Sequence, residues 1–258
     1  MLVFSAIVPH SPLLMPTIGK QNRHALSATL QSFDALSRRL EESRPDAVIV
    51  LSPHGSILEK EFPLQYAASY EARFDRFGDV ETVLTFNGST HIADALWQRI
   101  AQDFPVARIN DPVIDYGTAI PSHCLKLSVP ILPLGTALLD EHAHYQYGTC
   151  LGDALHHADA RLAVLGSLDL SHRLGPASPT GYSPHGKTFD AYILRMMQRG
   201  RMKDLSALDA ALAKEAGSCG IEILWMLWGV LHGRTYTTEL LSYESPFDVG
   251  YAVVNFGL

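Results

Sequence analysis

Three histidines each follow a short apolar run that has the composition of a buried strand. The pairs are residues 2–8 with His10, residues 48–51 with His54, and residues 162–165 with His172. Open α/β sheets bind ligands at the carboxyl ends of their strands, so all three imidazoles are expected at one edge of a sheet. Neutral imidazole is the commonest protein ligand for metal ions. The pattern therefore predicts a mononuclear metal site built on strand ends.

The elements that carry these histidines alternate along the chain. Residues 24–42 have helical periodicity and lie between the apolar runs 2–8 and 46–51. Apolar runs without strict alternation are typical of strands that are covered on both faces, as in a βαβ unit. The amino-terminal part of the chain therefore predicts parallel strands joined by a helix.

Later parts of the chain repeat the same alternation. Further strands are expected at residues 64–68, 83–86, 106–109, 129–134, 161–165 and 251–256. Further helices are expected at residues 91–104, 142–158, 188–199, 205–214 and 221–230. Residues 71–79 and 115–118 are expected to be loop and turn, and residues 173–187 either a lid or a surface loop. The predicted fold class is α/β: a single domain over residues 1–258 with a mostly parallel central sheet and helices on both faces.

Two residues are candidates for a third metal ligand. Glu222 lies within an apolar helix, where a carboxylate is costly to bury unless it is paired or binds a metal. Cys219 lies three residues earlier, on roughly the same side if both belong to one helix. A carboxylate suits Fe(II), whereas a thiolate favours zinc or copper(I), or makes the site sensitive to oxidation. The sequence favours Glu222 as the third ligand. The alternative for Glu222 is a carboxylate that forms a structural ion pair, and the alternative for Cys219 is a buried, unreactive thiol in the core.

Four motifs occur in a fixed order over nearly the whole chain. They are Pro9-His10-Ser11-Pro12, Ser52-Pro53-His54-Gly55, Asp169-Leu170-Ser171-His172-Arg173 and Cys219-Gly220-Ile221-Glu222. Each motif alone is weak, but the ordered set resembles the LigB superfamily. That superfamily contains the class III extradiol ring-cleavage dioxygenases and the Memo proteins.

The resemblance implies a cofactor, a substrate class and residue roles. Fe(II) would be bound by His10, His54 and Glu222, which matches the two-histidine, one-carboxylate triad that leaves positions open for substrate and O2. His172 would be the acid/base residue for a small catechol-like aromatic substrate. In Memo proteins a cysteine stands near the third ligand position, which would be Cys219 here. The expected functions are therefore extradiol dioxygenase or, alternatively, a Memo-like metal-binding or redox protein without ring cleavage. Zinc is the alternative metal, and a zinc hydrolase is a weaker third hypothesis.

One motif departs from the dioxygenase pattern. Many such enzymes carry a histidine in an Asp-His-Gly turn, and this chain has Asp115-Tyr116-Gly117. Tyr116 or His123 would replace that histidine, or neither side chain contacts the substrate. His185 is expected in a loop, and the remaining histidines are expected to be solvated on or beside helices. These are His24, His91, His142, His144, His156, His157 and His232.

The composition of the chain limits which binding partners and which cellular compartment are expected. The formal net charge is −7, from 20 Lys and Arg against 27 Asp and Glu, and no basic run is present, so a nucleic-acid partner is not expected. The three cysteines do not form a disulfide framework and fit a reducing cytoplasm. No apolar stretch is long enough to cross a bilayer, and residues 2–8 are expected to form a strand instead of a signal peptide. Homo-oligomerisation is left open.

Overall fold

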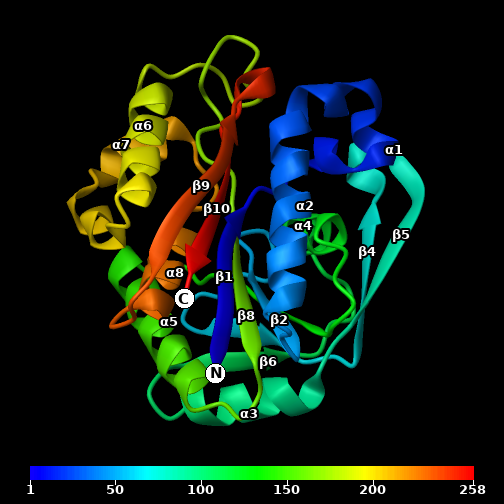
Figure 1. The fold of residues 1–258 in the computed structure, drawn as a ribbon, viewed down its shortest axis with the longest axis vertical. Helices are drawn as coiled ribbons and strands as arrows, with labels where there is room; N and C mark the ends of the chain where they lie inside the picture. The colour runs from blue at the N-terminus through cyan, green and yellow to red at the C-terminus, as the bar shows by residue number, and fades with distance from the viewer.

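Eight strands form one central sheet in the computed structural model, which describes residues 1–258 (Figure 1). They are β1 Leu2–Val8, β2 Ala47–Leu51, β3 Phe62–Gln65, β6 Val106–Ile109, β7 Ile131–Leu134, β8 Leu162–Ser167, β9 Thr237–Glu244 and β10 Tyr251–Gly257. Their order across the sheet is β6-β3-β7-β2-β8-β1-β10-β9. The strands β7, β2, β8 and β1 are parallel neighbours, and β6 is parallel to β3. The strands β10 and β9 are antiparallel, and β3 pairs antiparallel with β7. The mostly parallel α/β sheet is confirmed.

Helices cover both faces of this sheet. They are α1 Pro16–Gly19, α2 Ser27–Glu42, α3 Thr90–Ile100, α4 Tyr116–Cys124, α5 Glu141–His156, α6 His185–Gln198, α7 Ala210–Ala216 and α8 Ile221–Leu231. In Figure 1, α2 and α4 lie on one side of the strands, and α5 to α8 lie on the other. Side chains of β1 alternate between two apolar clusters, because Ile7 packs with α5 and α8 while Val8 packs with α2 and α4. Helices on both faces are therefore also confirmed.

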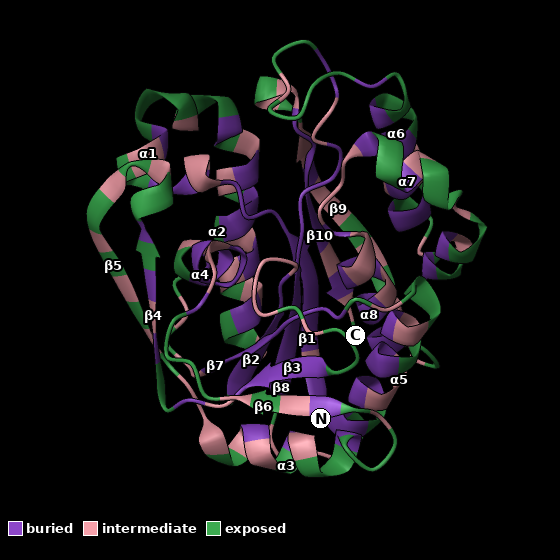
Figure 2. Cartoon of the chain, turned by 180° about the vertical axis from the view of Figure 1, so that it is seen from behind, coloured by how far each residue is buried: buried purple, intermediate pink, exposed green.

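Every residue of β2, β3, β7 and β8 is buried, and Figure 2 shows the sheet as the buried centre of the molecule. This burial explains why these strands read as continuous apolar runs, since neither face meets water. None of the helices combines the length and the apolar character needed to cross a bilayer.

The prediction of a loop at residues 71–79 was wrong for residues 71–74 and 79, which lie in strands, whereas residues 75–78 do connect two strands. A hairpin of β4 Ser69–Phe74 and β5 Asp79–Asn87 covers this region and forms a separate sheet. Tyr70, Ala72 and Phe74 are buried and alternate with charged residues that face outward. The period of two is the signal of a half-buried strand, and the charges on its outer face concealed it.

Residues 115–118 do not form an isolated turn either. Asp115 caps α4, because its Oδ1 accepts a hydrogen bond from the Thr118 backbone N–H at 3.0 Å. His185 is the first residue of α6 and not a loop residue. His144 is fully buried and not solvated, and its ring packs edge-on against Phe62. The strand β9 was not predicted, since its half-exposed residues lack an apolar run.

Candidate metal centre

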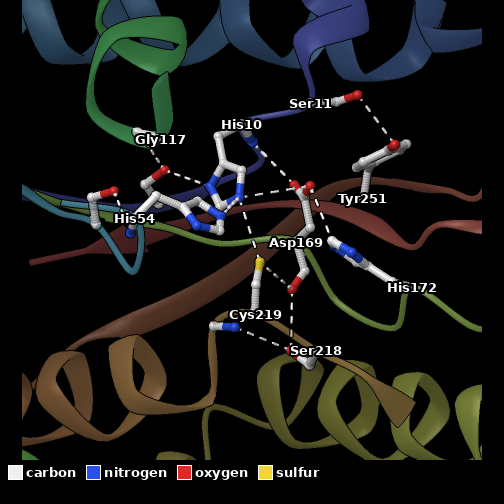
Figure 3. A network of polar contacts seen from close by, with 12 residues as sticks. His10, Ser11, His54, Gly117, Asp169, His172, Ser218, Cys219 and Tyr251 are labelled. Atoms are coloured by element: carbon white, nitrogen blue, oxygen red, sulfur yellow. Dashed lines mark hydrogen bonds and ion pairs between the residues drawn. The ribbon is translucent and has the colours of Figure 1, made fainter. Parts of the chain in front are cut away.

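The carboxyl ends of three adjacent parallel strands deliver the predicted histidines to one place (Figure 3). The strand β8 lies between β2 and β1, so the segments that follow these strands are neighbours. His10 follows β1, His54 follows β2, and His172 follows β8. Cys219 approaches from the other side, in the segment just before α8. Proline residues follow both β1 and β2 at Pro9 and Pro53, and proline cannot continue a central ladder.

Three potential ligand atoms converge at the centre of this site. His10 Nε2 lies 3.1 Å from His54 Nε2 and 3.4 Å from Cys219 Sγ. All three atoms lie within 4.8 Å of one another. A second group shares Cys219 and adds Asp169 and His172. The site therefore contains two imidazoles and one thiol, with a carboxylate and a third imidazole beside them.

Hydrogen bonds determine which nitrogen of His10 faces the centre. The Ser167 hydroxyl donates to the Gly117 carbonyl, so its oxygen accepts from His10 Nδ1 at 2.9 Å. His10 is therefore protonated at Nδ1, and the lone pair of its Nε2 points at His54 and Cys219. Such an outer contact orients a metal-binding histidine and fixes its tautomer.

The Gly117 carbonyl is free to accept this hydroxyl because of Pro121. In an α-helix this carbonyl would accept the N–H of the residue four positions later, and proline has no N–H. Gly117 also allows close packing at this point. A Cβ atom on Gly117 would lie 2.5 Å from Ser52 Oγ and 3.3 Å from the His54 ring. Pro121 therefore leaves a carbonyl free for the Ser167 hydroxyl that orients His10, and Gly117 leaves room for the His54 ring.

Burial keeps both imidazoles in the form that binds metal. Burial and the neighbouring His10 lower the pKa of His54 to about 3. His10 is fully buried, and burial likewise lowers its pKa, against the opposing effect of Asp169. Burial, followed by the nearby Asp169, raises the pKa of the Cys219 thiol. A metal ion would have to displace the thiol proton in order to bind sulfur.

Asp169 connects the centre to His172. Its Oδ1 accepts the His10 backbone N–H at 3.0 Å, and its Oδ2 lies 3.7 Å from both His10 Nε2 and His172 Nε2. Burial alone would raise the pKa of Asp169, but His10 and His172 outweigh burial and lower it. His172 Nε2 is shielded from solvent and has no hydrogen-bond partner. An imidazole held beside a carboxylate in this way is suited to accept and return a proton.

Tyr116 lies in the site and His123 does not. The Tyr116 ring stacks on His54 with centroids 4.5 Å apart and meets His10 edge-on at 5.5 Å. His123 lies at the other end of α4, is exposed, and lines a separate surface cavity with Arg23 and Cys124. Of the two predicted substitutes for the missing histidine, only Tyr116 contacts the metal-site residues.

Glu222 lies outside both groups of convergent ligand atoms. The helix α8 begins at Ile221, after Gly220, so Cys219 and Glu222 do not share one helix. The condition under which both would face the same side of one helix is therefore not met, whereas the predicted helix start at Ile221 is confirmed. Glu222 occupies the first helical turn, where a carboxylate is favoured by the helix dipole, and it is only half-buried. This position removes the need for a cation that the apolar sequence around Glu222 had suggested.

The spacing of the donors fits a bound transition metal. With bond lengths of about 2.0 Å to nitrogen and about 2.3 Å to sulfur, tetrahedral zinc would separate two nitrogens by roughly 3.3 Å and nitrogen from sulfur by roughly 3.6 Å. The distances of 3.1 Å and 3.4 Å are close to these values. Two imidazole nitrogens and a thiol also suit zinc, copper or iron better than a hard ion such as Mg²⁺.

Sequence reasoning assigned no role to Asp169 or Ser167. Asp169 belongs to a recognised motif and follows a buried strand, so the cost of burying its charge was an available signal. Ser167 is the last residue of β8 and carried no such signal, because its role depends on a carbonyl of α4.

Comparisons with known proteins identify the family of this chain. Residues 5–254 match the family model of the catalytic LigB subunit of aromatic ring-opening dioxygenase. Protein CA_C1420 of Clostridium acetobutylicum is 25% identical over 261 residues, which cover 96% of this chain and 56% of that protein. This chain thus spans little more than half the length of that relative.

A solved structure supports the fold. The crystal structure of the uncharacterized protein JW3007 from Escherichia coli K12 superposes with a TM-score of 0.69 at 15% sequence identity, covering 99% of this chain and 100% of that one. The family match covers every motif that contributes to the metal centre. This chain therefore belongs to the LigB family of aromatic ring-opening dioxygenase subunits.

Proposed function

We propose that this chain is a metal-dependent oxidoreductase of the extradiol type, which uses O2 to open a catechol-like ring. The observation that carries the proposal is the convergence of His10, His54 and Cys219 within a family of ring-opening dioxygenases. In this proposal Cys219 replaces Glu222 as the third ligand. Fe(II) held there would supply open positions for the substrate oxygens and for O2, as three-ligand iron sites do.

The remaining residues of the site have roles that need no further group. His172 accepts a proton from a catechol hydroxyl at Nε2, which is shielded and has no partner in the protein. Asp169 stabilises the resulting imidazolium from 3.7 Å, so the proton stays available for return to the product. Tyr116 packs against His54 and limits the directions from which a planar ring can approach.

A second candidate function is a Memo-like metal-binding or redox protein without ring cleavage. The sulfur donor favours this alternative, because a thiolate selects softer metals than the two-histidine, one-carboxylate triad does. Both candidates place the ion on His10, His54 and Cys219. They differ in whether a catechol is consumed.

Metal content and oxygen uptake test the two candidates together. The protein is prepared without oxygen, loaded with Fe(II) or Zn(II), and freed of loose metal before elemental analysis. Oxygen consumption and the yellow ring-opened product are then followed with a panel of catechols. Uptake that depends on both Fe(II) and a catechol supports the dioxygenase. Stoichiometric metal without uptake for any catechol supports the Memo-like function.

Two matched variants test the ligand set. Cys219→Ser should lose most of the bound metal, whereas Glu222→Gln should retain it, since only Cys219 lies among the convergent donors. Circular dichroism confirms that both variants fold. If Glu222→Gln loses the metal and Cys219→Ser keeps it, the third ligand is the Glu222 carboxylate and our assignment of Cys219 is wrong.

A further inference from the structure

The surface cavity beside His123 has a volume of about 340 Å³, which lies in the range of small-ligand pockets. Its walls come from α2, from the end of α4, and from the segment between β1 and α2. Figure 1 shows α2 and α4 side by side on one face of the sheet. Tyr116, the first residue of α4, belongs to the metal centre, whereas His123 and Cys124 in its last turn line this cavity. The cavity is therefore a second pocket, which the metal centre does not use.

The floor of this cavity is apolar. Leu14 and Phe33 are each 1% exposed and belong to the core cluster on this face of the sheet. Leu30 and Cys124 are half-buried and pack against the same cluster. Burial raises the pKa of the Cys124 thiol to about 12, so this side chain is a neutral part of the wall. Such a floor favours a ligand with an apolar part.

Arg23 supplies a cation to the cavity. Its Nε donates to the Leu14 carbonyl at 3.0 Å, which orients the half-buried guanidinium. No other nitrogen of this side chain has a hydrogen-bond partner in the protein, and no carboxylate forms an ion pair with it. Burial, followed by the nearby Arg23, lowers the pKa of His123, so the guanidinium charge acts on the cavity wall. Arg23 is therefore oriented but has no anionic partner.

A tight turn before Arg23 allows the guanidinium to reach this place. A Cβ atom on Gly19 would overlap the Leu13 carbonyl oxygen and would lie 2.7 Å from Arg23 Cγ. Lys20 follows with a φ of 47°, which residues other than glycine rarely adopt. Gly19 and Lys20 together fold the chain back, so that Arg23 lies over its own upstream segment. The position of Arg23 is therefore built into the backbone.

Lys126, at the exposed rim of the cavity, stands where a helix usually ends in glycine. Its N–H donates to the His123 carbonyl at 2.9 Å, and the Leu127 N–H donates to the Ser122 carbonyl at 3.1 Å. These two bonds form a Schellman motif, in which Lys126 takes the left-handed position with a φ of 56°. Glycine would adopt this conformation without strain, and strain of this kind is typical of ligand-binding positions. The Lys126 ammonium also pairs with Asp34 at 3.0 Å, which neutralises the carboxylate of this cavity.

We infer that this cavity binds a monocarboxylate with an apolar tail, whose carboxylate is held by the Arg23 guanidinium and whose tail lies on the apolar floor. An arginine fork forms two parallel hydrogen bonds with a carboxylate. Arg23 and Lys126 outnumber Asp34, so the cavity is positive in a chain whose formal net charge is −7. None of these residues belongs to the metal centre, so this site is independent of the proposed function.

Isothermal titration calorimetry of the metal-loaded protein measures the dissociation constants of four probes. They are acetate, hexanoate, hexanamide and hexylamine, which separate the effect of the tail from that of the charge. We expect hexanoate to bind at least tenfold more tightly than acetate, which lacks the tail, and than hexanamide, which lacks the charge. Hexylamine should bind most weakly of the six-carbon probes, because Arg23 repels it. Removal of the metal with a chelator should leave the affinity for hexanoate within twofold.

Variants and a chemical probe locate the site. Arg23→Gln should weaken hexanoate at least tenfold while leaving hexanamide within twofold of its original affinity. Arg38→Gln is the matched control, because Arg38 is an exposed arginine of α2 outside the cavity. Circular dichroism confirms that both variants fold. Saturating hexanoate should also slow the alkylation of Cys124 at least fivefold, measured by peptide mass spectrometry, and leave that of the equally half-buried Cys150 unchanged.

Several outcomes would overturn the inference. Equal affinities for hexanoate and hexanamide would show that the cavity does not recognise the negative charge. Tightest binding of hexylamine would show that Asp34 dominates and that the cavity recognises cations. Loss of hexanoate binding after removal of the metal would show that the carboxylate binds at the metal centre. Equal effects of Arg23→Gln and Arg38→Gln would show that Arg23 does not hold the ligand.

Discussion

Ser167 holds His10 in place although it lies outside the group of convergent ligand atoms. Its hydroxyl is shared between the Gly117 carbonyl, to which it donates, and His10 Nδ1, from which it accepts. Without this acceptor, nothing in these contacts holds the proton of His10 on Nδ1. The outer contact therefore selects the tautomer in which Nε2 is a ligand.

We expect Ser167→Ala to weaken metal binding about 10- to 100-fold, the range seen when such outer contacts of histidine ligands are removed. The apparent affinity is measured by competition with a chromophoric chelator. Ser11→Ala is the control, because Ser11 lies next to His10 but donates to Tyr251 instead. Equal affinities for the two variants would show that Ser167 does not orient His10.

At the scale of elements, a proline within α4 creates an acceptor for another element. Pro121 leaves the Gly117 carbonyl without its helical partner, and Ser167 of β8 occupies it. An interior proline normally costs a helix about 3 kcal/mol. Here the freed carbonyl connects α4 to the strand that orients His10.

Pro121→Ala should therefore have opposite effects on stability and on binding. The new N–H competes for the Gly117 carbonyl and strengthens α4, while the Ser167 hydroxyl loses its fixed orientation. We expect unchanged or higher thermal stability together with at least a threefold loss of metal affinity. A variant that gains stability and binds metal as tightly as the original protein would refute this role.

The packing of α5 against α8 depends on glycines, although glycine has a low helix propensity. A Cβ atom on Gly148 would lie 2.0 Å from the Met226 carbonyl oxygen, and one on Gly229 would lie 2.2 Å from the Tyr145 carbonyl oxygen. These glycines allow the two helix backbones to approach closely. The low helix propensity of glycine is offset by this contact.

Gly148→Ala should destabilise the protein by about 1–3 kcal/mol, although alanine is the better helix former. Urea unfolding of the metal-free protein measures the change. The exposed Gln146 lies in the same helix, and Gln146→Ala should change the free energy of unfolding by less than about 0.5 kcal/mol. A Gly148→Ala variant that is more stable than the original protein would contradict this role, because it would mean that α5 and α8 can move apart without a loss of free energy.

For the molecule as a whole, Asp190 joins segments that are distant in the sequence. It lies on α6, accepts the Ser171 backbone N–H at 2.8 Å, and accepts the Tyr243 hydroxyl of β9 at 2.7 Å. Burial raises the pKa of Asp190 to about 6, against these two hydrogen bonds. A buried carboxylate therefore holds together the segment after β8, which carries His172, and the antiparallel side of the sheet.

The pH dependence of stability should reveal this carboxylate. The folded protein keeps the Asp190 proton up to a pH of about 6, while the unfolded chain releases it near 3.8, so the folded state binds more protons between these values. The contribution of Asp190 to the free energy of unfolding therefore falls as the pH rises through this window, by about 3 kcal/mol in total. Other groups titrate as well, so a comparison with a variant is needed.

Asp190→Asn is that comparison, because the amide keeps a similar shape and does not titrate. Urea unfolding of both metal-free proteins is measured from pH 4 to pH 7. Relative to the variant, the original protein should lose stability progressively from pH 4 to pH 7. A difference between the two proteins that is constant over this range would contradict the raised pKa.

The sequence by itself determined the parts that depend on local pattern. Apolar runs covered on both faces predicted the parallel strands, and the histidines after them predicted the ligand-bearing edge of the sheet. The motif order identified the LigB family, which the family match confirms. The hairpin at 69–87 was missed in part because charges on its outer face obscured a regular alternation.

Only the tertiary structure decided which of Cys219 and Glu222 lies among the other donors. The two residues are three positions apart, and the sequence could not exclude that one helix holds both, but α8 begins between them. A helix start turns the preceding residue out of the helical repeat, so Cys219 reaches His10 and Glu222 does not. The tautomer of His10 likewise depends on Gly117 and Ser167, which are 50 residues apart. Distances of this kind are set by how elements pack against one another, and no local pattern in the chain encodes them.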